Sequence, residues 1–222
     1  MMKIKVIFVE PEYELNIGLS ARLLSNFGIK KMHLINPKCS LGFSAKMYAK
    51  HAKGIVEKSV IYRDLSEAIK ECDLVIGTTG IKNKYKEAGY QTIPLKELKE
   101  KINKRNLSKI ALVFGRESTG LRLEEIKKCD LVVNIPTSNK YPVLNITNAV
   151  AIFLYELTNI KTNKRMELAK KNEREYIKKL IAKKIEQRKL KNKEKIKVVL
   201  FQFIEKSFLE RLEAKALIEL LK

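Results

Sequence analysis

The chain has 222 residues, enough for one ordinary α/β domain with a modest appendage, and 45% of its residues are hydrophobic, as in soluble globular proteins. No apolar run approaches the ~20 residues that cross a bilayer, the first residues are typical of a strand and not of a signal peptide, and Cys39, Cys72 and Cys129 lie too far apart to indicate a disulfide framework or a metal site, which favours a reduced, cytoplasmic protein. The net charge of +21 favours a polyanionic partner, RNA or DNA above all, with an anionic membrane surface as the competing target.

The first 160 residues alternate between strand and helix patterns. Several of the strand patterns are continuously apolar, which predicts a mostly parallel sheet covered by helices on both faces. Asp64-x-x-Glu67 fits a capping box before one helix, and Gly28 fits a C-cap after another. The expected strands are 4–9, 31–35, 59–62, 73–77, 110–114 and 131–135, and the expected helices are 18–27, 65–72, 95–103, 124–129 and 146–157.

The composition changes after residue 157, so we expect a domain at 1–160 and a helical extension at 161–222. Residues 161–197 contain 16 Lys or Arg and 5 Glu, a net charge of +11. A long basic amphipathic helix is predicted from 165 to about 190, followed by one or two apolar helices over 198–221 with a break near Ser207. This extension packs either on the main domain or on a second subunit, and its basic face is either solvated or bound to RNA. The candidate RNA contacts on it are Lys178, Lys179, Lys183 and Lys184.

Polar residues follow the first expected strand, at the edge of the sheet where parallel α/β folds bind ligands. Asn16 is placed to cap the next helix, and Arg22 lies more than a turn into that helix, on a face that otherwise carries the small residues Gly18 and Ala21. Spacing alone leaves open the alternative that Asn16 is only a cap and Arg22 only a surface residue.

A second loop follows the apolar strand 110–114, where Gly115 and Gly120 bracket Arg116 and Glu117. Glycines let a ligand approach the backbone closely. An ordinary turn with a salt-bridged Arg-Glu pair is the alternative, but two charged residues at the tip of a core strand favour a functional role.

Two further loops have the same character. The long polar loop 134–145 follows the strand 131–135 and ends at Asn145, which is placed to cap the apolar helix behind it. Gly77-Thr78-Thr79-Gly80 follows the strand 73–77. No loop of the chain has the glycine pattern of a dinucleotide-binding or Walker motif, so nucleotide binding by those devices is not indicated.

Together these segments resemble the three motifs of the SpoU branch of the SPOUT methyltransferase superfamily, in order and spacing over roughly residues 3–158. Further features, including Val9-Glu10-Pro11, Asn36-Pro37 and the C-terminal extension, most resemble the TrmJ-type tRNA ribose methyltransferases, which modify nucleotide 32 of the anticodon loop. The three motifs are Asn16-x-Gly18-x-x-x-Arg22, then Leu112-Val113-Phe114-Gly115-Arg116-Glu117 with Gly120-Leu121, then Ile135-Pro136 followed by Leu144-Asn145 and Ala149-Val150.

The resemblance implies a C-terminal trefoil knot, a rare exception to unknotted chain topology. It also implies a homodimer whose site is completed across the interface, and S-adenosylmethionine (AdoMet) bound within the knot without a metal. Many relatives carry a serine before the Leu-Asn pair, whereas this chain has Pro142-Val143, so a catalytic hydroxyl at this point is not available. Carried across, the AdoMet-binding positions are Thr78, Thr79, Gly80, Gly115, Ile135, Val143, Leu144 and Asn145.

The implied reaction is attack of a ribose 2′-oxygen on the AdoMet methyl carbon, which requires an aligned hydroxyl that loses its proton. The family proposal makes Arg22 the base, but a guanidinium stays protonated in proteins. We therefore assign Arg22 to a substrate phosphate, Asn16 to fixing Arg22, and Glu117 to positioning or accepting the proton. Arg116 is a second candidate phosphate contact, and Asn145 is expected to help hold the cofactor or the ribose.

Two alternatives stay open at this point. Ribosomal RNA is the second candidate substrate, because ribose chemistry with backbone contacts carries little base information. The second alternative is a non-catalytic RNA-binding protein with the same fold, which only the Pro142-Val143 substitution favours. A basic membrane-surface protein would not explain the polar loops at the strand ends.

Overall fold

The computed structural model describes residues 3–103, 107–158, 168–207 and 209–222. The strands within these ranges form one sheet in the order β3-β2-β1-β6-β4-β7-β5, and every neighbouring pair is parallel. The predicted parallel α/β fold is confirmed. The strands are β1 (Lys3–Val9), β2 (His33–Ile35), β3 (Val60–Tyr62), β4 (Leu74–Thr78), β5 (Thr92–Pro94), β6 (Lys109–Phe114) and β7 (Leu131–Asn134).

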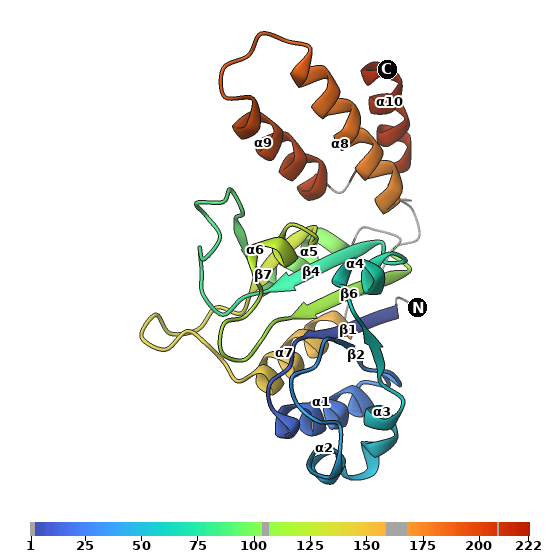
Figure 1. The fold of residues 1–222 in the computed structure, drawn as a ribbon, viewed down its shortest axis with the longest axis vertical. Helices are drawn as coiled ribbons and strands as arrows, with labels where there is room; N and C mark the ends of the chain where they lie inside the picture. The colour runs from blue at the N-terminus through green and yellow to red at the C-terminus, as the bar shows by residue number, and fades with distance from the viewer. Residues whose placement is uncertain (1–2, 104–106, 159–167, 208) are drawn as a thin grey trace.

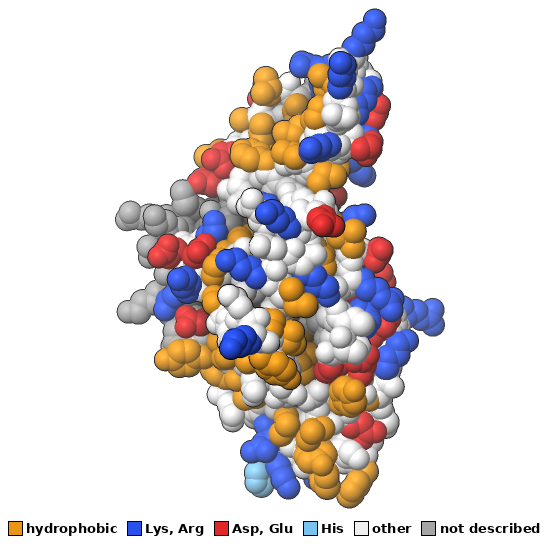
Figure 2. Space-filling model, turned by 90° about the vertical axis from the view of Figure 1, so that its left-hand side faces the viewer, with side chains coloured by type: hydrophobic (Ala, Val, Ile, Leu, Met, Phe, Trp, Pro, Cys, Tyr) orange, Lys and Arg blue, Asp and Glu red, His pale blue; other side chains and the backbone are white. Residues whose placement is uncertain are grey.

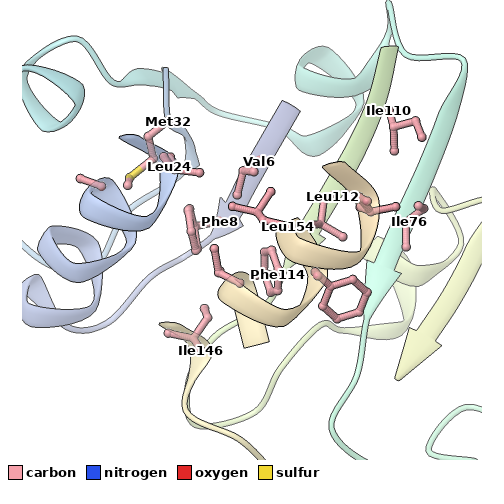
Figure 3. Packing of buried hydrophobic residues seen from close by; sticks show 14 of the residues in the cluster. Val6, Phe8, Leu24, Met32, Ile76, Ile110, Leu112, Phe114, Ile146 and Leu154 are labelled. Atoms are coloured by element: carbon pink, nitrogen blue, oxygen red, sulfur yellow. The ribbon is translucent and has the colours of Figure 1, made fainter. Parts of the chain in front are cut away.

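Helices cover both faces of the sheet (Figure 1). Successive strand residues point to opposite faces, so Val6 and Phe8 of β1 pack under α1, α2, α3, α5 and α7, whereas Ile7 and Val9 pack under α4 and α6. Phe114 links strand and helix in the larger core, stacked on Phe8 at 5.6 Å and edge-on to Phe153 at 5.7 Å between ring centroids (Figure 3). The helices are α1 (Glu14–Asn26), α2 (Phe43–Ala49), the 3-10 turn η1 (Lys50–Ala52), α3 (Lys53–Glu57), α4 (Leu65–Ile69), α5 (Leu95–Asn103), α6 (Leu123–Ile126) and α7 (Ile146–Thr158).

Three differences from the sequence prediction concern one element boundary and two segments whose structure was not predicted. Helix α1 begins at Glu14 and not at 18, because Tyr13 is the last extended residue and the Glu14 carboxylate suits the first turn of a helix. The segment 43–57 was not predicted as helical, because its helical pieces are short and break at Lys50, whose φ is 52°. The strand β5 was missed because it has three residues and ends in Pro94 at the edge of the sheet.

The predicted C-cap after α1 is present, whereas at α4 the structure shows the predicted N-cap residue without the full capping box. Gly28 follows α1 with a φ of 71°, the left-handed conformation that glycine adopts without strain. Asp64 is the N-cap of α4, and its Oδ1 accepts a hydrogen bond of 2.6 Å from the Ser66 N–H. These local signals therefore placed the C-terminal end of α1 and the N-terminal end of α4.

The C-terminal helices α8 (Lys171–Glu186), α9 (Lys193–Lys206) and α10 (Arg211–Leu221) form a separate cluster above the sheet (Figure 1). They enclose a small core of their own, which includes Ile177 and Ile204. The predicted break near Ser207 is confirmed, since this residue ends α9. The expected boundary at 160 and the first residues of the predicted helix from 165 lie outside the described residues.

A buried ionic cluster joins α8 to the sheet. Arg174 Nη1 lies 3.1 Å from Asp130 Oδ1 and 3.1 Å from Glu205 Oε2, and Arg174 Nη2 donates to the Asp73 carbonyl oxygen. Asp130 Oδ2 in turn accepts a hydrogen bond of 2.7 Å from the Val75 N–H of β4. Burial and the nearby Asp130 carboxyl raise the pKa of Glu205 to about 7. The described part of the chain contains no helix that is both long and apolar enough to cross a membrane.

Candidate active site

Loops from the carboxyl ends of three strands surround a cavity of about 790 Å³. The loops are 79–91 after β4, 115–122 after β6 and 135–145 after β7. The start of α1, which follows β1, completes the wall of the cavity. Figure 1 shows two of these loops, 79–91 and 135–145, projecting from the same side of the sheet. They meet because parallel strands end at one edge.

All the residues predicted to bind AdoMet line this cavity. Gly115 is required by close packing, because a Cβ at this position would lie 2.2 Å from the carbonyl carbon of Gly120. A Cβ on Gly80 would lie 3.2 Å from Val143 Cα, so the loops after β4 and β7 press against each other. The apolar part of the wall includes Phe114 and Phe153. The residues in question are Thr78, Thr79, Gly80, Gly115, Ile135, Val143, Leu144 and Asn145.

A chain of hydrogen bonds links the three motif segments at the wall of the cavity. Asn16 Nδ2 donates to Glu117 Oε1 at 2.9 Å, and Asn145 Nδ2 donates to Asn16 Oδ1 at 3.3 Å. Glu117 Oε2 accepts a further bond of 3.0 Å from the Glu12 N–H. Asn145 also caps α7 as predicted, because its Oδ1 accepts from the Thr147 N–H at 2.8 Å.

The structure corrects the prediction for Asn16. This residue is not the cap of α1, because the helix starts two residues before it and the Tyr13 carbonyl accepts the Asn16 N–H at 3.1 Å. Its side chain is 6% exposed and faces Glu117 and Asn145. Asn16 therefore joins two loops of the site, and its side-chain bonds do not involve Arg22.

Arg116 is not available to a phosphate, which corrects a second prediction. Its guanidinium is buried and ion-paired, with Nε 2.9 Å from Glu10 Oε2 and Nη2 2.8 Å from Glu125 Oε1. Nη1 also donates to the Gly120 carbonyl oxygen at 3.1 Å. These carboxylates raise the pKa of Arg116. Its role is structural, since it closes the 115–122 loop and ties it to the end of β1.

Arg22 lies on the outer side of α1 and does not line the cavity of its own chain. Arg22 lies six positions after Asn16, which places it about 9 Å further along the helix and about two-thirds of a turn around it. The buried face of α1 carries Asn16, Ser20 and Leu24, whereas Arg22 is exposed to solvent. Within one chain the first motif therefore splits between the cavity and the outer surface.

The lysines predicted to contact RNA fall into two groups. Lys178 is largely buried and ion-paired with Glu205 and Glu175, so the structure contradicts its assignment as an RNA contact. Lys179 and Lys183 are exposed on α8. Lys184 is partly exposed on the same helix. Figure 2 looks onto the side that carries the strand ends and shows Lys and Arg side chains on the C-terminal helices at the top.

Sequence reasoning missed two residues of the site, Lys84 and Tyr85. Both line the cavity from the 79–91 loop, where Lys84 Nζ donates to the Thr119 carbonyl oxygen at 2.5 Å and Tyr85 Oη donates to the Leu121 carbonyl oxygen at 2.7 Å. No local pattern marks them, because their partners are about 35 residues away in sequence. Among the described residues, no group of His, Cys, Asp or Glu is arranged to hold a metal ion.

Comparison with known proteins adds three findings. The family model described as "SpoU rRNA Methylase family" matches residues 3–155. A tRNA (cytidine-2′-O-)-methyltransferase TrmJ of Methanocaldococcus jannaschii is 36% identical over all of both chains, and the protein of the same name in Sulfolobus acidocaldarius is 39% identical over 73% of this chain and 68% of its own. The crystal structure of TrmJ from Z. mobilis ZM4 superposes with a TM-score of 0.74 at 21% identity, over 98% of this chain and 96% of that chain, and so shares the fold.

Proposed function

Because the chain belongs to the SpoU rRNA methylase family, we propose that it transfers a methyl group from AdoMet to a ribose 2′-hydroxyl of an RNA. The observation that carries this proposal is the convergence of three distant segments on one cavity: Asn16 of α1, the 114–120 turn and the 135–146 loop. These are the segments on which the sequence resembles the family.

The cavity fits AdoMet in size and in lining. Its volume of about 790 Å³ lies within the roughly 300–1,000 Å³ typical of small-molecule sites. Phe114, Phe153 and Ile135 offer apolar surface for the adenine ring, and the tight Gly115 turn leaves backbone groups accessible. AdoMet would be held by the eight predicted positions from Thr78 to Asn145. When bound, it supplies an electrophilic methyl group.

The residues around the cavity would align the ribose and stabilise its nucleophilic oxygen. With AdoMet bound, the 2′-oxygen would form a bond to the methyl carbon as the sulfur–carbon bond breaks, and the hydroxyl proton would pass to solvent water. Asn16 and Asn145 are held by the hydrogen bonds that end at Glu117, so their amide groups are fixed before substrate arrives. We assign Glu117 to this positioning, since both of its oxygens already accept hydrogen bonds.

Arg22 would act in the site of a partner subunit. It faces away from its own cavity, on a helix whose neighbourhood exposes large apolar side chains that a dimer interface would cover. These include Leu15 of α1, Phe43 of α2 and Ile152 of α7, which are 42%, 82% and 37% exposed. Both α2 and α7 pack on α1. A homodimer built through this surface would carry the guanidinium to a substrate phosphate in the other subunit.

The proposed substrate is a cytoplasmic tRNA, at the C or U of position 32 in the anticodon loop. Two relatives are named tRNA (cytidine-2′-O-)-methyltransferases, and a net charge of +21 suits a polyanion. A ribosomal RNA is the second candidate, favoured by the description of the family. The exposed Lys179 and Lys183 would contribute phosphate contacts.

Incubation of the protein with labelled AdoMet and separated fractions of tRNA and rRNA tests the proposal. We expect the label in tRNA, as a 2′-O-methylated nucleotide that nuclease mapping places at position 32. A methylated base in place of a methylated sugar would refute the reaction class, and labelling of rRNA alone would favour the second candidate. Calorimetry that detects no AdoMet binding would favour a non-catalytic RNA-binding scaffold.

A further inference from the structure

A second cavity, of about 400 Å³, lies at the junction between the sheet and the C-terminal helices. Its walls come from Tyr90 in the loop before β5, from Lys127 and Cys129 next to α6, and from α8 and α9. We call it the junction cavity. It is separate from the proposed AdoMet cavity, and no step of the proposed reaction uses it.

The junction cavity presents two hydrogen-bond donors that have no charged acceptor among the described residues. The Gln202 side-chain nitrogen is buried and has no hydrogen-bond partner in the described parts of the chain. The Lys206 ammonium beside it contacts Gln202 Oε1 at 3.4 Å and has no carboxylate partner among the described residues. Burial lowers the pKa of Lys206. A buried donor and a partly desolvated ammonium are both stabilised by an anionic oxygen.

The carboxylates in the same wall are mostly compensated, because Asp130, Glu205 and Glu175 share the two cations Arg174 and Lys178. Arg174 pairs with Asp130 and Glu205, and Lys178 pairs with Glu205 and with the more exposed Glu175. One negative charge is left over from this network, and Lys127, Lys179 and Lys206 line the cavity without a carboxylate partner in the described ranges, so the lining is positive on balance.

The remaining surface of the junction cavity suits a nucleoside. Tyr90 and Phe201 are only partly buried and line it, and aromatic rings of this kind stack on bases of single-stranded RNA. A volume of about 400 Å³ is at the lower end of the roughly 300–1,000 Å³ of ligand sites, which fits one nucleotide and excludes a duplex.

We propose that the junction cavity binds one unstacked nucleotide of the RNA substrate, with its phosphate against Lys206 and Gln202 and its base against Tyr90 and Phe201. The inference rests on the proposed function, because it takes RNA as the substrate. It adds a pocket for a specific nucleotide between the sheet and the C-terminal helices. The exposed lysines of α8 alone would attract the RNA backbone without fixing the position of any nucleotide.

A single turn of chain separates the junction cavity from the AdoMet cavity. Tyr85 lines one and Tyr90 lines the other, and the Tyr90 N–H donates to the Tyr85 carbonyl oxygen at 3.0 Å. Gly89 in this turn lies so close to α9 that a Cβ would be 2.6 Å from Gln202 Nε2. A nucleotide bound at Gln202 would therefore lie next to the 85–90 turn, whose Tyr85 lines the AdoMet cavity.

Lys206→Met tests this inference, because methionine keeps the apolar stem and removes the ammonium. The matched control is Lys195→Met, on an exposed residue of the same helix that does not line the cavity. Binding of full-length protein to a tRNA transcript is measured by fluorescence anisotropy over a series of salt concentrations. We expect Lys206→Met to weaken binding about tenfold and to reduce the salt dependence by about one phosphate contact, and Lys195→Met to stay within about twofold of wild type.

Gln202→Leu is a second variant that removes the unpartnered donor, and it should also weaken tRNA binding. AdoMet affinity, measured by calorimetry, should stay unchanged in Lys206→Met. The inference is overturned if Lys206→Met and Gln202→Leu both bind tRNA like wild type, or if Lys195→Met loses as much affinity as Lys206→Met. It is also overturned if free cytidine monophosphate binds wild type but not Lys206→Met while tRNA binding is untouched.

Methyl transfer is measured separately, so the two proposals fail independently. A wild-type protein that binds tRNA through Lys206 without methylating it would contradict the proposed function and support the junction site. A protein that methylates tRNA with no effect of either substitution would contradict the junction site alone.

Discussion

Glutamine at position 117 would keep the size of the side chain but replace one acceptor oxygen by an NH₂ group. In the structure both oxygens of Glu117 accept, Oε1 from Asn16 Nδ2 at 2.9 Å and Oε2 from the Glu12 N–H at 3.0 Å. The new NH₂ would face one of these donors, so one hydrogen bond must be lost. A hydrogen bond to a charged group contributes about 1.5–3 kcal/mol, which corresponds to roughly 10- to 150-fold in rate if it is fully expressed in the transition state.

The assay for Glu117→Gln is the single-turnover rate of tRNA methylation at saturating AdoMet, measured between pH 6 and pH 9. If Glu117 positions Asn16, the rate should fall by roughly 10- to 150-fold and the shape of the pH profile should be kept. A general base contributes about 10²- to 10⁴-fold, and its removal would abolish the acidic limb of the profile. A loss above a thousandfold together with a flat profile would refute the positioning role, and so would an unchanged rate.

Glu12→Gln is the matched control for this experiment. Glu12 lies beside Glu117, and its carboxylate accepts from the Ser118 N–H at 2.9 Å and from the Ser118 hydroxyl at 2.7 Å. Because a hydroxyl can also accept, glutamine can satisfy both groups at this position. Glu12→Gln should therefore change the rate less than Glu117→Gln does.

Four further outcomes are expected. Arg22→Ala should abolish methyl transfer and leave AdoMet binding intact in calorimetry; normal turnover would remove Arg22 from the mechanism. Gly115→Ala should weaken AdoMet binding at least tenfold, because its Cβ would meet backbone at 2.2 Å, whereas Gly54→Ala, with nothing within 4 Å, should match wild type. Arg174→Met leaves buried carboxylates unpaired and should lower the free energy of unfolding by about 3–5 kcal/mol in urea; a loss near that of an exposed ion pair, under about 1 kcal/mol, would contradict this. The raised pKa of Glu205, about 7 against an ordinary 4.5, contributes stability that is fully present below pH 4.5 and is lost as pH rises through 7. The free energy of unfolding of Glu205→Gln should therefore rise relative to that of wild type between pH 5 and pH 8. The same difference between the two proteins at pH 5 and at pH 8 would contradict this.

Local patterns in the chain were sufficient for much of the fold. Continuous apolar strands such as 110–114 predicted a sheet covered on both faces, and the sheet is parallel throughout its described strands. The loops that follow β4, β6 and β7 were predicted to meet, and they line one cavity. This worked because strand direction and side-chain alternation are properties of short segments, and parallel strands bring their carboxyl ends to one edge.

The same sequence could not show which charged side chains are free. Arg116 was predicted to contact a phosphate, but its partners Glu10 and Glu125 lie 106 and 9 residues away in sequence. Lys178 looked like its neighbour Lys179, yet only Lys178 reaches Glu205 of another helix.

The identity of most segments and the parallel class of the sheet thus follow from residues close together in sequence, whereas the strand order and the availability of a charge depend on which distant groups lie together. Helix periodicity cannot distinguish a buried ion pair from a solvated lysine when both occupy the border of an apolar face. Packing brings carboxylates to Arg116 and Lys178, whereas among the described residues it leaves the Gln202 side-chain nitrogen without an acceptor and Lys206 without a carboxylate. The path of the chain in three dimensions therefore determines which of its many cations can meet a substrate.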